Sequence, residues 1–246
     1  FNKMDYIDYQ NNNSTELHFW FKAKNNLIHK LLNSVLGGNN NKILDIGCGT
    51  GTELEILSKF GKVTALDTNE NAVNLTRELG YDTIHADIQN YAFTEQYDCI
   101  CCFDILEHIE QDEQVLMNIY KALKPGGFFV FTVPAHQWLF SPHDKYLDHK
   151  RRYSKKDIKE KLIKANFSIK TISFWNSLLF PLVAIIRLTK ILLMKLSIIE
   201  NFSSESQTPN KYINHFLFLL LDQEKKIALT LLSAPTGLSI YGIVKK

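Results

Sequence analysis

Short apolar segments alternate with amphipathic ones along the first half of this 246-residue chain. Each short apolar run is bounded by polar residues or glycine, which is typical of buried β-strands. In the longer segments apolar residues recur every three or four positions, which predicts α-helices. The pattern predicts strands at 43–46, 62–66, 83–85, 97–102 and 128–133, with helices at 52–60, 70–79 and 111–123.

Further elements flank this alternating region. A helical pattern over 14–36 ends at a pair of glycines, and another helix begins at Ser154, three residues before Asp157 in a variant of the capping box. Residues 175–236 are mostly helical in pattern and too many for an ordinary connection, so we expect a helical insertion. It is enclosed by two more predicted strands, at 167–174 and 239–244.

Strands separated by helices predict a parallel sheet with helices on both faces. We therefore expect an α/β fold of the doubly wound, Rossmann-like type, with its ligand at the carboxyl ends of the strands. Strand alternation sends Cys99 and Cys101 to one face and Cys102 to the other. With Cys48 they are interpreted as reduced core residues, because their spacing does not form a tetrahedral zinc site.

The first predicted strand runs into a glycine-rich turn, D-I-G-C-G-T-G over residues 45–51. Glycine tolerates positive φ and lets a ligand approach the backbone without a Cβ in the way. A helix starting near Thr52 presents free N–H groups and its positive dipole end to a ligand above the turn. The turn therefore predicts a site for a nucleotide-type cofactor. Its G-x-G-x-G spacing differs from the G-x-G-x-x-G of dinucleotide enzymes.

Acidic residues follow at the ends of the next two strands. Asp67 comes about twenty residues after the glycines, where a carboxylate can accept both ribose hydroxyls. Asp87 is suited to hydrogen-bond an exocyclic amine such as the adenine N6. The turn K-P-G-G at 124–127 then leads directly into the fifth strand.

Together these features resemble the class I S-adenosylmethionine-dependent methyltransferases, which residues 43–133 match in motif and in order. The segment F-D-I-L-E-H-I at 103–109 is similar to the corresponding element of that family. The resemblance implies a seven-stranded sheet in the order 3-2-1-4-5-7-6, with strand 7 antiparallel. It also implies S-adenosyl-L-methionine as the cofactor and S-adenosyl-L-homocysteine as the product.

The same resemblance implies a role for each cofactor contact. Asp45 and the glycine backbone hold the methionine end, Asp67 the ribose and Asp87 the adenine amine. The Ile88 backbone contacts the ring edge, and the Phe103 backbone faces the methionine ammonium. The full set of implied contacts is Trp20, Asp45, Gly47, Cys48, Gly49, Gly51, Asp67, Thr68, Asp87, Ile88, Phe103 and His108.

A narrower resemblance covers the N-terminal helix. The run H-F-W-F-K-A-K at 18–24 is similar to the H-W-W-F-x-A-R helix of a bacterial subgroup associated with envelope-polysaccharide or lipid-linked sugar pathways. Lys24 replaces the arginine of that pattern, and Trp20 is interpreted either as packing over the cofactor or as a core aromatic. Residues of the subgroup recur after the fifth strand at Pro134, Ala135, Trp138, Asp144, His149, Arg151, Arg152 and Tyr153.

The polar segment 134–153 emerges beside the expected cofactor. Methyl transfer to oxygen usually needs a base, and histidine is the natural one near neutral pH. The candidate catalytic bases are therefore His136, His143 and His149. No residue spacing in this segment completes a set of metal ligands, so we expect no metal site.

The same segment supplies candidate substrate-binding residues. Arg151 and Arg152 are suited to clamp a phosphate or carboxylate of the acceptor, or alternatively to fix the loop by pairing with Asp144 or Asp148. The candidate substrate-binding set is Asp144, Arg151, Arg152 and Tyr153.

The insertion at 175–236 is expected to form a cap. Arg187, Lys190 and Lys195 lie opposite a broad apolar helix face, so residues 178–199 predict contact with an anionic membrane surface. An apolar lid that receives a lipid tail, or a helix packed on its own domain or on a dimer partner, are the alternatives. The face consists of Leu182, Ile185, Ile186, Leu188, Leu192, Leu193, Leu196 and Ile199.

Composition adds limits rather than a function. The net charge of +2, from 28 Lys and Arg against 26 Asp and Glu, does not favour nucleic acid as a partner. Residues 1–20 contain no apolar leader, so we expect a cytoplasmic protein that contacts the inner face of the membrane peripherally. We expect three units. Residues 1–40 form a segment that covers the cofactor, residues 41–174 together with 237–246 form the cofactor-binding domain, and residues 175–236 form a cap.

The sequence thus predicts an S-adenosylmethionine-dependent methyltransferase that methylates oxygen on an apolar or lipid- or sugar-linked acceptor. A small phenol, a quinone precursor or an amine is the alternative acceptor. Two other functions stay open. A non-catalytic cofactor-binding regulatory module would bind S-adenosylmethionine without needing the histidines, and an NAD-linked reductase would bind NADH instead.

Overall fold

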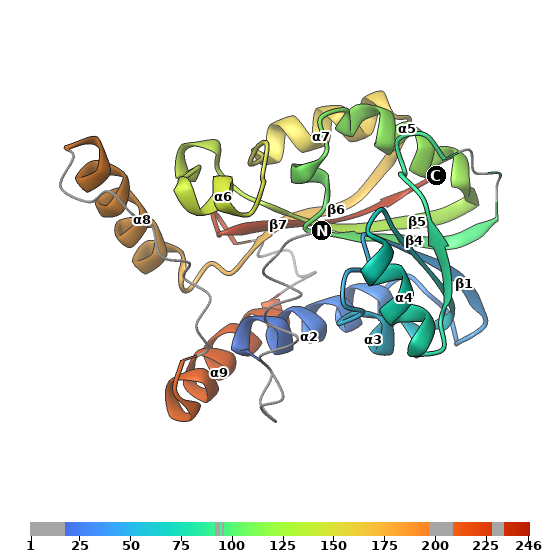
Figure 1. Cartoon of the computed structure of the whole chain (residues 1–246), viewed down its shortest axis with the longest axis horizontal. Helices are drawn as coiled ribbons and strands as arrows, with labels where there is room; N and C mark the ends of the chain where they lie inside the picture. Colours follow the sequence, from blue (N-terminus) through green and yellow to red (C-terminus); the bar gives the residue numbers. More distant parts are fainter. Residues whose placement is uncertain (1–17, 92–93, 95, 197–208, 228–233) are drawn as a thin grey trace.

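The computed structural model describes residues 18–91, 94, 96–196, 209–227 and 234–246. Its centre is a seven-stranded sheet in the order β3-β2-β1-β4-β5-β7-β6 (Figure 1). β7 pairs antiparallel with β5 and β6, and the other pairs are parallel, which confirms the predicted fold. The strands are β1 (Asn41–Ile46), β2 (Gly61–Asp67), β3 (Asp82–His85), β4 (Tyr97–Phe103), β5 (Leu123–Pro134), β6 (Ser168–Trp175) and β7 (Ser239–Lys245).

Helices cover both faces of the sheet. One apolar cluster joins the sheet to α5 and α7, and a second joins it to α2, α3 and α9 on the opposite face (Figure 1). The helices are α2 (Phe19–Asn33), α3 (Leu54–Ser58), α4 (Glu70–Glu78), α5 (Asp112–Ala122), α6 (Pro142–Tyr146), α7 (Lys155–Lys164), α8 (Phe180–Lys195) and α9 (Lys211–Ile227). Two short 3₁₀ turns are η1 (Leu106–His108) and η2 (Gln137–Leu139).

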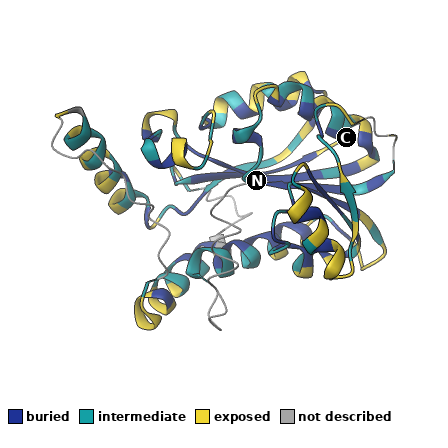
Figure 2. Ribbon diagram, viewed as in Figure 1, coloured by how far each residue is buried: buried dark blue, intermediate teal, exposed yellow. Residues whose placement is uncertain are grey.

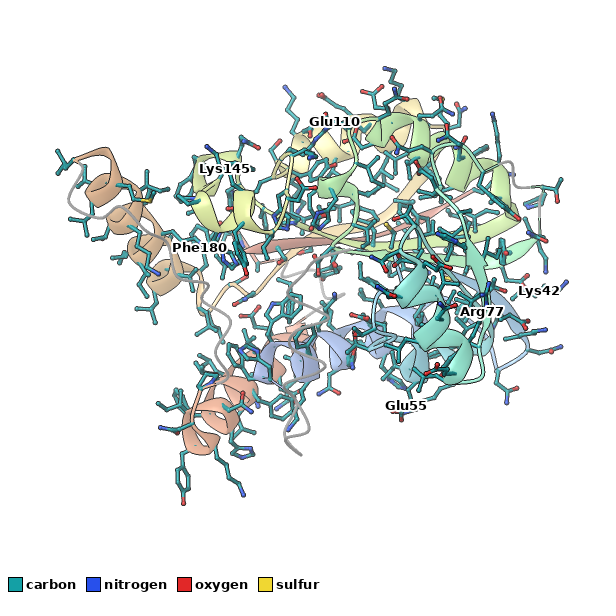
Figure 3. All side chains as sticks on the ribbon, in the orientation of Figure 1. Lys42, Glu55, Arg77, Glu110, Lys145 and Phe180 are labelled. Carbon is teal, nitrogen blue, oxygen red and sulfur yellow. The ribbon has the colours of Figure 1, made fainter. Side chains whose placement is uncertain are left out.

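Strand β4 shows why the core has two halves. Cys99 and Cys101 belong to the cluster under α2, whereas Ile100 and Cys102 belong to the cluster under α5, as the alternation predicts. Burial raises the pKa of the Cys101 and Cys102 thiols well above its usual value. The inner strands β1, β4, β5 and β7 are buried over most of their length, whereas charged side chains such as those of Lys42, Glu55 and Arg77 point outward (Figures 2 and 3).

Two element boundaries differ from expectation. The helix after the glycine turn is shorter than predicted, because residues 52–53 complete the turn before α3 begins at Leu54. The K-P-G-G turn lies within β5 as an irregularity, where Leu123 pairs with Tyr97 and Phe128 pairs with Cys99. The left-handed Gly126, at φ 82°, turns the chain there.

The insertion contributes two helices, α8 and α9, which differ in whether they pack against the rest of the protein. α9 lies beside α2, where the Asn214 side chain accepts a hydrogen bond from the Phe19 N–H at 2.8 Å and Asn26 donates to Asp222 at 2.6 Å. α8 extends away from the sheet at the left of Figure 1. Within the described residues, neither helix is long and apolar enough to cross a membrane. Some predicted positions lie outside the described residues, at 1–17, 197–208 and 228–233.

Candidate active site

A cavity of about 960 Å³ opens at the carboxyl ends of the parallel strands, where the fold predicts a ligand. α2 closes it on one side with Trp20 and Lys24. Many of the predicted cofactor contacts line it, namely Trp20, Gly47, Cys48, Gly49, Asp67, Thr68, Asp87, Ile88, Phe103 and His108. Three candidate acceptor residues line it as well, namely His143, His149 and Arg152.

The glycine turn forms part of the cavity wall and packs too closely against its neighbours for a larger residue at position 47. Gly47, Gly49 and Gly51 all have positive φ, at 74°, 51° and 81°. A Cβ added to Gly47 would lie 2.3 Å from the side chain of Ile105, so the close approach of these segments requires glycine. The N–H groups of Gly47 and Gly49 donate to the Leu66 carbonyl and the Asp67 carboxylate, so these bonds fix the turn, and its bare backbone lines the cavity.

Two carboxylates anchor the neighbouring strand ends. Asp67, 5% exposed, accepts hydrogen bonds from the N–H groups of Gly49 at 2.9 Å and Asn69 at 2.8 Å. Asp87 accepts from the Gln89 N–H at 2.8 Å. These bonds fix both side chains at the cavity wall, and each carboxylate keeps lone pairs for further donors.

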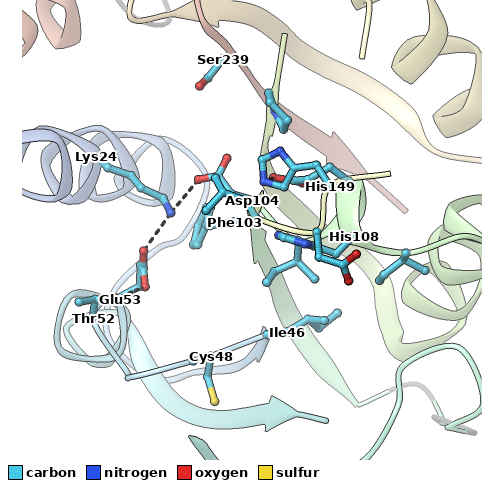
Figure 4. A pocket seen from close by; sticks show the side chains of 18 of the residues that line it. Lys24, Ile46, Cys48, Thr52, Glu53, Phe103, Asp104, His108, His149 and Ser239 are labelled. Atoms are coloured by element: carbon cyan, nitrogen blue, oxygen red, sulfur yellow. Dashed lines mark hydrogen bonds and ion pairs between the residues drawn. The ribbon is translucent and has the colours of Figure 1, made fainter. Parts of the chain in front are cut away.

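A buried lysine bridges two acidic residues in the same wall (Figure 4). The Lys24 ammonium lies 3.0 Å from the Glu53 carboxylate and 2.9 Å from that of Asp104. Burial opposes the charge of Lys24, but the charges of Asp104 and Glu53 outweigh it and raise the lysine pKa. The ammonium also lies 4.8 Å from the ring centre of Trp20. Glu53 and Asp104 were not predicted as site residues, although Glu53 is the second residue after the glycine turn.

Asp144 organises the acceptor side of the cavity. Its carboxylate accepts hydrogen bonds from the Ser141 N–H at 2.9 Å, from His149 Nδ1 at 3.0 Å and from Arg152 Nε at 2.7 Å. Arg187 of α8 reaches the same carboxylate at 3.4 Å. Burial opposes ionisation of Asp144, but the hydrogen bond from His149 and the charges of Arg152 and Arg187 hold its pKa well below the usual range.

His149 and Glu107 face one another across the cavity floor. His149 Nε2 lies 3.9 Å from Glu107 Oε1, and neither Glu107 oxygen has a hydrogen-bond partner among the described residues. Glu107 is fully buried, and burial together with the charge of Asp104 raises its pKa well above the usual value. His108 packs edge-on against His149 at 4.7 Å, and burial and His149 lower the pKa of His108 to about 4.

Other predicted site residues do not line the cavity. His136 has φ 64°, and its Nε2 lies 2.9 Å from the Thr236 hydroxyl, with the ring stacked on Phe174. The Tyr153 hydroxyl donates to Asp112 at 2.7 Å, and Arg151 pairs with Asp112 and Glu110. The predicted site residues outside the cavity lining are Asp45, Gly51, His136, Asp144, Arg151 and Tyr153.

One cluster could hold a cation, although the sequence predicted no metal site. Ligand atoms of Glu107, His108 and His149 all lie within 4.8 Å of one another. The sequence placed Glu107 and His108 in one motif, but His149 comes from a loop that only the fold brings beside them. The arrangement of an acid and two imidazoles suits a divalent ion as well as proton transfer.

The sequence comparisons agree with this arrangement of strands and glycine turn. Residues 44–131 match the profile of a methyltransferase domain. This segment is therefore similar to a methyltransferase domain. The chain is 33% identical over 102 residues to a ubiquinone biosynthesis O-methyltransferase of Hydrogenovibrio crunogenus, covering 38% of this chain and 42% of that protein. A malonyl-[acyl-carrier protein] O-methyltransferase of Calditerrivibrio nitroreducens is 26% identical over 155 residues, covering 55% and 63%.

Solved structures extend the likeness beyond the methyltransferase domain. An S-adenosylmethionine-dependent methyltransferase from Mesorhizobium loti superposes with a TM-score of 0.55 at 17% identity, over 88% of this chain and 96% of that one. A phosphoethanolamine N-methyltransferase of Haemonchus contortus, in complex with S-adenosyl-L-methionine, gives 0.58 at 20% identity, over 90% and 52%. The fold is thus that of S-adenosylmethionine-dependent methyltransferases. The chain spans only about 40% of the first curated relatives.

Proposed function

We propose that this chain is an S-adenosylmethionine-dependent O-methyltransferase in which His149 is the base. The observation that carries the proposal is that the glycine turn and His149, which Asp144 holds in place from behind the lining, line one cavity. When bound, S-adenosylmethionine supplies an electrophilic methyl group on a positively charged sulfur. The chain's own residues then have to bind the cofactor, place the acceptor and remove its proton.

The cavity wall fits this cofactor. Gly47 and Gly49 line the cavity without side chains, so a ligand can approach their backbone closely. Asp67 and Asp87 offer carboxylates for the ribose hydroxyls and the adenine amine. Lys24 lies beside the turn, where its charge suits the methionine carboxylate. The pair of acidic groups around Lys24 suits the methionine ammonium.

His149 is placed to act as the base. The Asp144 carboxylate is ionised and can only accept, so Nδ1 of His149 carries the hydrogen and Nε2 is left to accept a proton. The acceptor hydroxyl would give its proton to Nε2 of His149 as its oxygen takes the methyl group that the cofactor would supply, with the thioether as the leaving group. Glu107, whose pKa is raised by burial, is available to hydrogen-bond the same acceptor oxygen.

We propose an apolar acceptor with an acidic hydroxyl, of the quinone-precursor class. Ile109, Leu147 and Leu238 give the acceptor side of the cavity an apolar part. The curated relatives are named O-methyltransferases, which supports transfer to oxygen. The relatives named for ubiquinone biosynthesis favour a quinone precursor over a sugar-linked acceptor. A lipid-linked acceptor is the second candidate, because the helix at the cavity mouth exposes an apolar face.

The test compares two of the three histidines, His136 and His149, that the sequence offered as candidate bases. With S-adenosylmethionine and a panel of phenols and amines, His149→Gln is expected to lower kcat by about 10²–10⁴-fold, with unchanged affinity for S-adenosylhomocysteine. His136→Gln, which is not in the cavity lining, is expected to retain activity. Equal losses in both variants would refute the assignment of the base.

Three further outcomes separate the rival functions. Tight S-adenosylhomocysteine binding without turnover on any acceptor would support a regulatory module. Binding of NADH without S-adenosylhomocysteine would indicate a reductase. Loss of activity in EDTA, restored by Zn²⁺ or Fe²⁺, would assign Glu107, His108 and His149 to a metal site instead of to proton transfer.

A further inference from the structure

The outer face of α8 is apolar and uncovered. Ile185 is 64% exposed and Leu192 is 56% exposed, which is unusual for large aliphatic side chains gathered on one helix. Figure 2 shows this helix extending from the body with much of its surface exposed. The exposed large apolar residues of α8 are Leu182, Ile185, Ile186, Leu188 and Leu192, and Leu196 follows at its end.

The orientation of α8 is the reverse of that in an ordinary surface helix. Ala184 is buried, and the Arg187 side chain, only 12% exposed, turns inward to pair with Asp144. A soluble surface helix normally buries its apolar face and exposes its charged one. The Arg187–Asp144 pair fixes the opposite arrangement, with the apolar face directed away from the protein.

The charge of the segment indicates what covers that face. Between residues 178 and 196 there is no acidic residue, and besides Arg187, which pairs with Asp144, the ionisable residues are Lys190 and Lys195. The exposed side chains are aliphatic, whereas protein interfaces are enriched in Tyr, Trp and Arg at their centres. A basic, aliphatic helix complements an anionic lipid surface. The second helix of the insertion adds exposed Tyr212 and Phe216, which suit the interfacial region of a bilayer.

We propose that α8 lies flat on the surface of a bilayer that contains anionic lipids. Its 16 residues form a rod of roughly 24 Å, enough for a surface anchor. The consequence for the site follows from Arg187 and Asn176, which line the cavity next to this helix. Docking would hold the cavity mouth at the lipid surface, so that an apolar acceptor passes directly from the bilayer. Only this delivery step rests on the proposed function.

Vesicle flotation tests the docking. The wild-type chain is expected to float with phosphatidylcholine vesicles containing about one third phosphatidylglycerol, and more weakly with pure phosphatidylcholine or at high salt. The double variant Ile185→Glu with Leu192→Glu changes one face, since these residues are two turns apart. It is expected to weaken binding by about tenfold or more for each substitution. Both positions are solvent-exposed, so the fold is expected to persist.

The matched control also replaces two exposed apolar residues by glutamate, but on helices other than α8. Ile163→Glu with Met117→Glu alters two exposed apolar residues on α7 and α5, at 53% and 40% exposure. This variant is expected to float like the wild type. Equal weakening in both double variants, or no flotation of the wild type at low salt, would overturn the proposal. A wild-type dimer in light scattering that becomes monomeric only in the α8 variant would assign the face to a second copy of the chain and refute lipid docking.

A cofactor measurement separates this proposal from the proposed function. Calorimetry with S-adenosylhomocysteine is expected to give the same affinity for the wild type and for both double variants. Flotation without S-adenosylhomocysteine binding would leave the docking intact and refute the methyltransferase. Cofactor binding without flotation would refute the docking and leave the proposed methyltransferase function intact.

Discussion

Replacing Asp67 tests the cofactor site most directly. Each of its carboxylate oxygens already accepts one backbone N–H, from Gly49 at 2.9 Å and from Asn69 at 2.8 Å. A carboxylate oxygen has about two acceptor positions, so one remains on each oxygen for a ribose hydroxyl. Hydrogen bonds to a charged group contribute about 1.5–3 kcal/mol each, and the loss of two corresponds to about 3 kcal/mol at the lower end.

Asp67→Ala is therefore expected to weaken S-adenosylhomocysteine binding by about 100-fold or more in titration calorimetry. Asp67→Asn keeps one carbonyl acceptor and is expected to lose about tenfold. Circular dichroism should accompany each titration, because two partly buried N–H groups, of Gly49 and Asn69, lose their acceptor in the alanine variant. Asp82→Ala removes an exposed acid that pairs with Lys62 and should leave binding unchanged. An affinity of Asp67→Ala within about threefold of the wild type would refute the ribose assignment.

Three other substitutions probe separate features. Gly47→Ala should abolish S-adenosylhomocysteine stabilisation in a thermal-shift assay, whereas Gly38→Ala, at a similar φ of 70° but with no atom within 4 Å, should keep it. Tyr153→Phe loses the bond to Asp112 and should lower the free energy of unfolding by about 1–3 kcal/mol without changing cofactor affinity. For His108, urea unfolding should show that the free energy of unfolding of the wild type falls by up to about 3 kcal/mol as the pH is lowered from about 6.5 to 4. The His108→Gln variant should not show this decrease.

The sign of the His108 effect follows from its lowered pKa. The unfolded imidazole takes up a proton near pH 6.5, whereas the folded one does so only at about pH 4. Its contribution to stability is therefore complete above pH 6.5 and is lost as the pH falls through that interval. A wild-type stability that is flat between these pH values would contradict the burial of a neutral His108.

The strands and the glycine turn could be predicted because their signals are local. Alternation in β4 assigned Cys99, Cys101 and Cys102 to the correct faces, and the Ser154 cap starts α7 as its spacing indicated. The order of the strands came from family resemblance, since no local pattern specifies which strands are neighbours. The turn at 124–127 was recognisable from its glycines, although its pairing with β4 was not.

The acceptor side was harder to predict because its contacts are long-range. His136, His143 and His149 were equivalent as sequence, and only the fold directs His136 to Thr236 and His149 to Asp144. The Arg187–Asp144 pair joins residues 43 positions apart, so no sequence spacing reveals it. Helical periodicity gave the apolar face of α8 but could not tell whether that face pointed inward or outward.

The contact between α2 and α9 bears on the order in which the protein is made. Phe19 and Asn26 bond to residues 195 and 196 positions later in the chain. A ribosome delivers α2 early, and its partner helix emerges only after six of the seven strands have been synthesised. Part of the apolar surface of α2 therefore stays uncovered until α9 has been synthesised. The side of the cofactor cavity that α2 forms is completed only near the end of translation. We expect nascent chains that stop before α9 to need protection by chaperones and to bind no cofactor.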